Sequence, residues 1–156
     1  MIKCNYLMWK ELLKIRVLPK RLPSILNSYL KAGVIETDDE CLVSKFFTEK
    51  NPHLLIEQYE DRVAKEHTIN EIEINNWVES DFLEVSIKYL CKLVNMLEQV
   101  NTQSEIIVYF FKAESGYIVT WHKKRDDELT WIPISDIDKE KYALMIISVS
   151  HLKSRP

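Results

Sequence analysis

Apolar positions recur at helical spacing in the N-terminal third of the chain. Met8, Leu12 and Ile15 stand three or four residues apart with charged residues between them, until a proline breaks the pattern. A second short helix is predicted over residues 23–33, where Gly33 is typical of a helix C-terminus. The pattern therefore predicts two helices before the middle of the chain.

The middle of the chain has a less definite pattern. Residues 41–47 form an apolar run that fits a helix or a strand, and residues 54–66 show no single period. Apolar Ile72 and Ile74 alternate with polar neighbours, which predicts a short strand around residues 69–75.

A wide apolar stripe predicts a long helix from Ser80 or Asp81 to about Val100. Asp81 is a suitable N-cap, and an acidic residue near a helix start is stabilised by the helix dipole. The stripe consists of Phe82, Val85, Leu90, Leu93, Val94, Leu97 and Val100. We expect this helix to pack on a sheet.

Two runs rich in β-branched and aromatic residues follow, at 105–113 and 117–123. Gly116 lies between them and predicts a hairpin turn. A charged turn over residues 123–128 then leads into a third predicted strand at 129–134, so that three antiparallel strands follow in order along the chain.

The C-terminal part completes the predicted fold. Residues 136–142 are expected to form a short helix, and residues 144–149 a further strand or a buried helical turn. We predict a single domain over residues 1–156 of the α+β class: N-terminal helices and one long central helix, packed on a mainly antiparallel sheet of three to five strands.

Composition supports a folded protein without membrane spans. Apolar residues make up 46% and charged residues 29%, as in ordinary globular proteins. The longest apolar stretches fall well short of the roughly 20 residues that span a bilayer, and the first residues lack the pattern of a secretory signal. The sequence therefore predicts a cytoplasmic protein.

The residue types that carry catalysis or bind metals are sparse and isolated. The three cysteines are widely spaced, which favours reduced thiols, and two glycines are too few for a phosphate-binding loop. The histidines, which show no metal-ligand spacing, are His53, His67, His122 and His151. We therefore expect a protein that is not an enzyme and that has no cofactor and no metal.

Charge is distributed unevenly along the chain. Residues 1–33 hold seven Lys and Arg against one Glu, a balance of +6, whereas residues 34–84 hold fourteen acids against four bases, a balance of −10. The remaining residues hold ten bases and nine acids, and the total is −3. A basic end and an acidic middle predict opposed surface potentials.

The acidic middle is the candidate binding surface. Negative charge in a coherent patch would speed and orient the encounter with a basic partner, and a tryptophan beside it would supply an anchor. The candidate partner-binding residues are Asp38, Asp39, Glu40, Glu57, Glu60, Asp61, Glu71, Glu73, Trp77 and Glu79. Trp131 is a further candidate anchor, and a solvated face or core packing is the alternative for these residues.

The order of elements, the acidic middle, the strand 116–121 and Trp131 give the chain a resemblance of type to known proteins. It resembles bacterial immunity proteins of contact-dependent growth inhibition and related polymorphic toxin systems. The resemblance implies a cytoplasmic inhibitor that binds a cognate toxin domain one to one as a monomer. The toxin is often a nuclease, whose basic cleft the inhibitor blocks through its acidic surface.

Two alternatives remain open from the sequence. One is an enzyme or small-ligand domain with a pocket between the long helix and the sheet, which includes His122. The other is a nucleic-acid adaptor that uses the basic N-terminus, although a pI near 5.8 argues against direct nucleic-acid binding.

Overall fold

A five-stranded antiparallel sheet forms the centre of the structure, a computed structural model that describes residues 1–150. The strand order is β1-β7-β5-β6-β4, and each neighbouring pair is antiparallel. The strands are β1 (Ile2–Cys4), β4 (Ile72–Glu73), β5 (Ile106–Lys112), β6 (Tyr117–Lys123) and β7 (Leu144–Val149). A separate hairpin pairs β2 (Val34–Glu36) with β3 (Leu42–Ser44).

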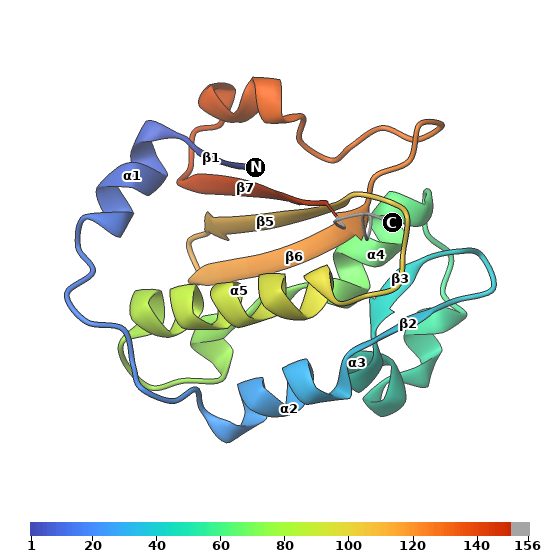
Figure 1. Ribbon diagram of the computed structural model, residues 1–156, viewed down its shortest axis with the longest axis horizontal. Coiled ribbons are helices and arrows are strands. Elements are labelled where there is room, and N and C mark those ends of the chain that lie inside the picture. Colours follow the sequence, from blue (N-terminus) through green and yellow to red (C-terminus); the bar gives the residue numbers. More distant parts are fainter. Residues whose placement is uncertain (151–156) are drawn as a thin grey trace, which may run out of the picture.

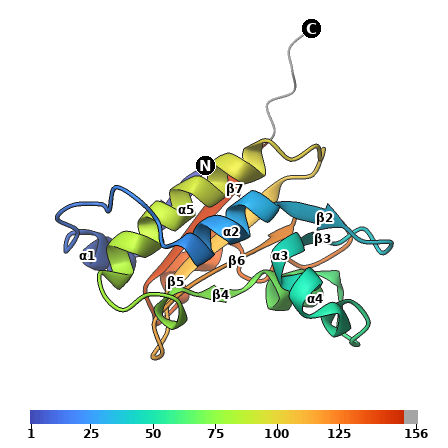
Figure 2. The same ribbon diagram turned by 90° about the horizontal axis from the view of Figure 1, so that it is seen from below.

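Helices cover one face of this sheet and extend beyond one of its ends (Figures 1 and 2). The long α5 (Phe82–Glu98) crosses the face, with α2 (Ser24–Ala32) beside it. The other α-helices are α1 (Tyr6–Leu12), α3 (Lys45–Lys50) and α4 (Arg62–Asn70). Short 3₁₀ helices form η1 (Pro52–Leu55), η2 (Ile74–Asn76) and η3 (Ile134–Lys139). This arrangement confirms the predicted α+β class.

Apolar side chains fill the space between α5 and the sheet. Val108 and Phe110 of β5 lie fully buried against Leu93 and Leu97 of α5, because alternate strand residues face the helix. Burial of each such side chain contributes roughly 1.5–3 kcal/mol. At the β7–β1 edge of the sheet a hollow of about 400 Å³ remains beneath α5, lined mainly by apolar side chains such as Leu90, Val94 and Ile147. It lacks the cluster of buried polar groups that the alternative of an enzyme or ligand pocket requires, and His122 lies on the opposite face of the sheet, where it contacts Tyr109.

The opposite face of the sheet is covered by residues 129–142, which are irregular apart from the short 3₁₀ helix η3. Ile132 and Ile137 of this segment pack on Tyr109 and Ile146 of the sheet. The hydroxyl of Tyr109 donates to the carbonyl of Ile132 at 3.3 Å. The prediction of a strand at 129–134 is therefore wrong: these apolar residues cover the face, and β7 takes the place beside β5.

Several elements follow their local patterns. Residues 23–33 form α2, which ends at Gly33 with a φ of 74°. The long helix begins after Asp81 and ends at Glu98, although the Asp81 side chain makes no capping hydrogen bond. The predicted hairpin around Gly116 forms as β5 and β6, and residues 144–149 form a strand.

Other boundaries differ from the predictions. The first helix ends at Leu12 instead of reaching Ile15. Residues 41–47 contain both a strand and the start of a helix, and residues 69–75 are mostly helical, with only Ile72–Glu73 paired as a strand. The short helix expected at 136–142 is the 3₁₀ helix η3, which starts two residues earlier.

Asn5 anchors the N-terminal segment to the sheet. Its side chain accepts the backbone N–H of Met8 at 3.0 Å, which caps α1, and that of Leu144 at 3.1 Å. The same amide donates to the carbonyl of Tyr142 at 2.8 Å. Because Asn5 is buried, these bonds fix α1 at the start of β7. Across residues 1–150, no helix combines the length and apolarity that a membrane span requires.

The close approach of Gly116 to Asn75 generates a stability prediction. Gly116 has a φ of 145°, and an added Cβ would lie 2.2 Å from the Asn75 side chain, which accepts the Tyr117 N–H at 3.0 Å. We expect Gly116→Ala to lower the free energy of unfolding by about 2–3 kcal/mol, as measured by urea denaturation. The cost should shrink but not vanish in an Asn75→Ala background, because the two closest atoms, Cγ and Oδ1, are removed while the Cβ of residue 75 stays 2.7 Å away. An equal cost in both backgrounds would contradict this explanation.

Candidate functional site

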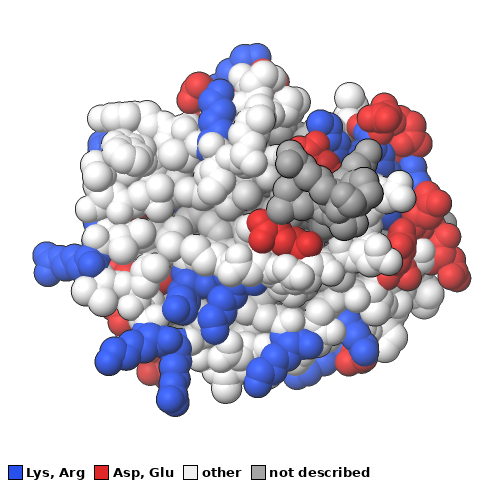
Figure 3. Space-filling view, in the orientation of Figure 1, with Lys and Arg blue, Asp and Glu red and all other residues white. Residues whose placement is uncertain are grey.

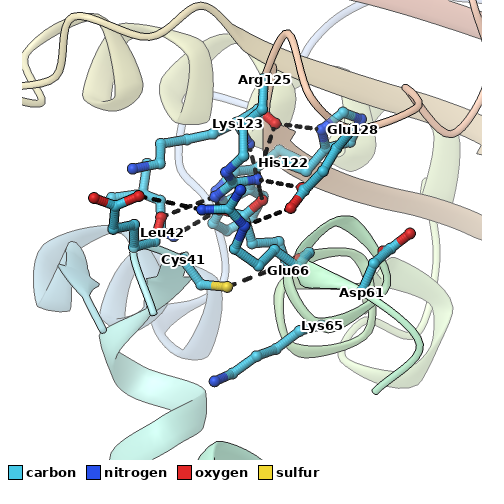
Figure 4. A network of polar contacts seen from close by, with 12 residues as sticks. Cys41, Leu42, Asp61, Lys65, Glu66, His122, Lys123, Arg125 and Glu128 are labelled. Atoms are coloured by element: carbon cyan, nitrogen blue, oxygen red, sulfur yellow. Dashed lines mark hydrogen bonds and ion pairs between the residues drawn. The ribbon is translucent and has the colours of Figure 1, made fainter. Parts of the chain in front are cut away.

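A buried ion pair joins α4 to the loop after β6. Glu66 has no exposed surface, and its two carboxylate oxygens accept hydrogen bonds from the Arg125 guanidinium at 2.8 and 2.9 Å. The carboxylate also accepts the backbone N–H of Leu42 at 2.6 Å and of Lys123 at 3.1 Å (Figure 4). The pair therefore ties together α4, β3, β6 and the loop.

Arg125 is held in its charged form by this arrangement. Burial by itself lowers the pKa of Arg125, but the hydrogen bonds and charge of Glu66 outweigh that effect and raise the pKa. Arg125 also donates to the backbone carbonyl of Glu40 at 2.8 Å, which brings the β2–β3 turn against the loop. Two segments that are far apart in sequence thus lie side by side.

Arg62 makes a second link between the same two segments. Its guanidinium donates to Glu40 at 3.2 Å, to Asp127 at 3.0 Å and to Glu128. The hydrogen bond to Glu128 is the main cause that raises the pKa of Arg62. Since Arg62 begins α4, it places the turn and the loop on either side of the helix start.

Asp39 in the β2–β3 turn is also held by its neighbours. The hydroxyl of Thr37 donates to its carboxylate, and Lys65 donates to both carboxylate oxygens at 3.1 and 2.9 Å. The hydrogen bond from Thr37, followed by the contacts with Lys65, lowers the pKa of Asp39 to about 2. The carboxylate therefore remains charged over the physiological pH range.

These contacts form an acidic end, which we define as residues 38–40 and 126–128. Together with Glu66 these segments hold seven carboxylates, whereas Arg62, Lys65 and Arg125 supply three cations, so the local balance is 3 − 7 = −4. Figure 3 shows carboxylates gathered where Figure 1 places the β2–β3 turn and the loop, and lysines and arginines gathered on the other side of that face. The folded protein thus separates acidic and basic side chains in space, as the uneven charge along the sequence suggests.

The structure brings only part of the candidate set together. Asp38, Asp39 and Glu40 share the β2–β3 turn and are exposed. Asp61 lies next to Arg62 and caps α4 by accepting the Ala64 N–H at 2.7 Å. The two remaining acids of this region, Glu57 and Glu60, are exposed in the segment before α4, and Glu57 lies 3.6 Å from His53.

The other four candidates lie away from the acidic end. Glu73 is half-buried in β4 and pairs with Ile118, near the β5–β6 turn. Trp77 packs edge-on against Tyr29 at 5.7 Å. The last two are exposed, Glu71 just after α4 and Glu79 just before α5. Figure 1 places the start of α5 far from the β2–β3 turn, so no single patch contains all ten residues.

The cations of the N-terminal segment leave the acidic residues free. Among residues 1–150, the ion pairs of Lys3 and Lys14 go to Asp138 and Glu11, and none joins residues 1–33 to an acid of residues 34–84. The acidic residues are instead neutralised in part by Arg62 and Lys65 of α4 and by Arg125 of the loop after β6.

The two histidines near this end have structural environments. His122 is buried, with Nε2 at 3.1 Å from the Tyr109 hydroxyl and Nδ1 at 2.8 Å from its neighbour's carbonyl, and burial lowers its pKa. Burial also lowers the pKa of His67, to about 4, and its ring packs against Trp131 at 4.0 Å. His53 is exposed, and His151 lies outside the described residues. Within residues 1–150, no group of three His, Cys, Asp or Glu side chains is placed to hold a metal ion.

Comparison with known proteins identifies a family. The model of the family described as the Uncharacterized protein PM0498 family matches residues 3–155. The chain belongs to this family. Neither the curated proteins nor the solved structures contain a match.

Some residues of the acidic end were not among the sequence candidates. Residues 126–128 were expected only to form a charged turn, and Arg62, Glu66 and Arg125 were not singled out. One signal was present: Glu66 lies three residues from Val63 and from Ile69, on the buried side of α4. A carboxylate among apolar positions of a helix face indicates a buried partner of opposite charge.

The buried pair predicts a large effect of charge removal. Glu66→Gln should lower the free energy of unfolding by about 3–5 kcal/mol, because it removes the bidentate countercharge of the largely buried Arg125 guanidinium and leaves only Glu128, at 3.4 Å. Urea denaturation followed by circular dichroism measures the change. Glu49→Gln is the control, since its ion pair with Lys45 is solvent-exposed and its loss should destabilise much less. Equal effects of the two variants would contradict a dominant role for the buried pair.

The low pKa of His67 predicts how stability depends on pH. In the unfolded chain a histidine has a pKa near 6.5, whereas the pKa of His67 in the folded protein is about 4. Between these values the unfolded state binds more protons, so the free energy of unfolding should rise as pH increases from about 4 to 6.5. His67→Gln should make this rise shallower than it is in His53→Gln, a change at an exposed position. Parallel curves for the two variants would show that His67 does not carry the effect.

Proposed function

We propose that this protein binds a basic partner protein through its acidic end and thereby blocks that partner's active site. The observation that supports this most strongly is the net negative charge that remains at residues 38–40 and 126–128 after internal pairing. Such a surface attracts a positively charged cleft and orients the encounter.

The internal ion pairs suit a binding role because they make the surface rigid. Arg62 and Arg125 fix the backbone and side chains of both segments before any partner arrives. Binding then requires little further ordering, which lowers its entropic cost. A charged surface that is already in place is therefore better suited to fast and tight association than a flexible acidic tail.

Exposed apolar side chains next to the acidic end supply candidate anchors. Leu129 follows the acidic loop directly and is 88% exposed. Trp131 is 38% exposed and is held by ring contacts with His67 and with Tyr109, at 4.9 Å from the latter. A rigid aromatic ring with one free face is typical of an interface hot spot. Trp131 thus replaces Trp77 as the anchor in this proposal.

The resemblance to immunity proteins supports a specific version of this function. In that version the partner is a cognate bacterial toxin domain, and the protein neutralises it in the cytoplasm as a monomer in a one-to-one complex, without catalysis. A nuclease is the preferred class, because a carboxylate surface occupies the positive potential that otherwise attracts phosphates. The test is co-expression with the toxin domain encoded beside this protein, followed by co-purification and a growth assay.

Removal of two charges tests the binding surface. Asp38 and Asp126 are exposed and make no ion pair among residues 1–150. Asp38→Asn with Asp126→Asn should therefore leave stability unchanged and slow association with the toxin domain about 3- to 10-fold at low salt, as measured by surface plasmon resonance. Glu79→Gln with Glu114→Gln is the control, because it removes the same charge at exposed positions away from the acidic end. Equal slowing in both pairs, or no effect in either, would refute the proposed surface.

A further inference from the structure

A hollow lined by lysines opens at the end of the molecule opposite the acidic end. It lies where α1, the β5–β6 turn and the residues before β7 meet, and Figure 1 shows these elements at the other extremity from the β2–β3 turn. Its volume is about 400 Å³, which is in the range of small-ligand sites. We call it the lysine cavity, and its charged lining consists of Lys10, Glu11, Lys14, Lys112, Glu114 and Lys141.

The lysine cavity has an excess of positive charge. Four lysines face two glutamates in its lining, so the local balance is 4 − 2 = +2. Two of the lysines, Lys10 and Lys141, form no ion pair with any residue of the part of the chain that the structure describes, although Lys10 lies over the ring of Tyr6. A concave surface with this balance raises the local concentration of anions.

Glu11 organises the other two lysines without using up their hydrogen-bonding capacity. Its carboxylate accepts one hydrogen bond from Lys14 at 2.7 Å and one from Lys112 at 3.3 Å. Each ammonium has three N–H donors, so two donors remain on each lysine for a ligand. The hydroxyl of Tyr117 also donates to Glu11, at 2.6 Å, and holds the carboxylate in place.

The walls of the lysine cavity are fixed by hydrogen bonds. The Asn5 side chain donates to the carbonyl of Tyr142, and the Lys112 N–H donates to the carbonyl of Ala143 at 3.0 Å. These bonds join α1, β5 and the segment before β7 at the rim. A ligand therefore meets a preformed site, which reduces the cost of binding.

We infer that the lysine cavity binds a small phosphate-bearing molecule with at least two negative charges. The four lysines of the lining act as compact point charges, the form in which lysine binds phosphate oxygens. The phosphate comes either from an inorganic polyphosphate or from a nucleotide. This inference does not depend on the proposed function, because it concerns the opposite end of the molecule.

Isothermal titration calorimetry of the full chain with sodium tripolyphosphate tests the inference. We expect saturable binding, weakened about tenfold or more in Lys10→Gln with Lys141→Gln, because two of the four cations are removed. These lysines make no ion pair in residues 1–150, so the variant should fold, which circular dichroism checks. Lys20→Gln with Lys31→Gln removes two exposed cations outside the cavity and should change the affinity less than twofold.

Further ligands distinguish the source of the phosphate. If ATP binds more tightly than tripolyphosphate and adenosine does not bind, a nucleotide is the ligand class; if tripolyphosphate binds as well as ATP, the phosphates alone are recognised. The absence of binding at about 10 mM tripolyphosphate, or equal weakening by the two lysine pairs, would overturn the inference. A single-stranded oligonucleotide that binds while tripolyphosphate does not would also overturn it, in favour of a nucleic-acid surface.

Discussion

The carboxylate of Glu66 has no contact with solvent, and the Arg125 side chain that neutralises it is only 8% exposed. An isolated buried charge is strongly unfavourable, and the pair is stable only while α4, β3 and the end of β6 keep their positions. The same contact holds the β2–β3 turn against the loop after β6, because Arg125 also binds the backbone of Glu40. The geometry of the exposed acidic residues thus depends on the Glu66–Arg125 pair beneath them.

The two ends of the molecule use charge in different ways. At the acidic end, cations of the protein neutralise some carboxylates and leave others free, which gives a rigid surface with a net negative charge. At the lysine cavity, one carboxylate positions two ammonium groups and leaves most of their donors free. At both ends an internal ion pair orders the side chains, and the sign of the charge that remains unpaired determines which ligand or partner is attracted.

The elements that the sequence predicted well depend on local patterns. The stripe from Phe82 to Val100 and the turn at Gly116 each specify their own conformation, and both form as expected. The order of strands in the sheet cannot be predicted in this way. By sequence, the apolar runs 129–134 and 144–149 could each pair with β5, and only packing over the whole sheet selects the second. The candidate site could also be predicted only in part. The sequence shows residues 38–40 as an acidic run, but it does not show that they lie close to residues 126–128. Arg62 and Arg125 produce that proximity, because each binds both segments or their neighbours.

The position of β7 has a consequence for synthesis of the chain. This strand lies between β1 and β5, although among residues 1–150 it is the last strand and β1 is the first. During translation, β5 and β6 emerge before β7, which pairs with β5. The hydrogen-bond partners of Asn5 in residues 142 and 144 are synthesised about 140 residues after Asn5 itself. The sheet can therefore close only after β7 has left the ribosome, so we expect its five strands to come together in one late, cooperative step.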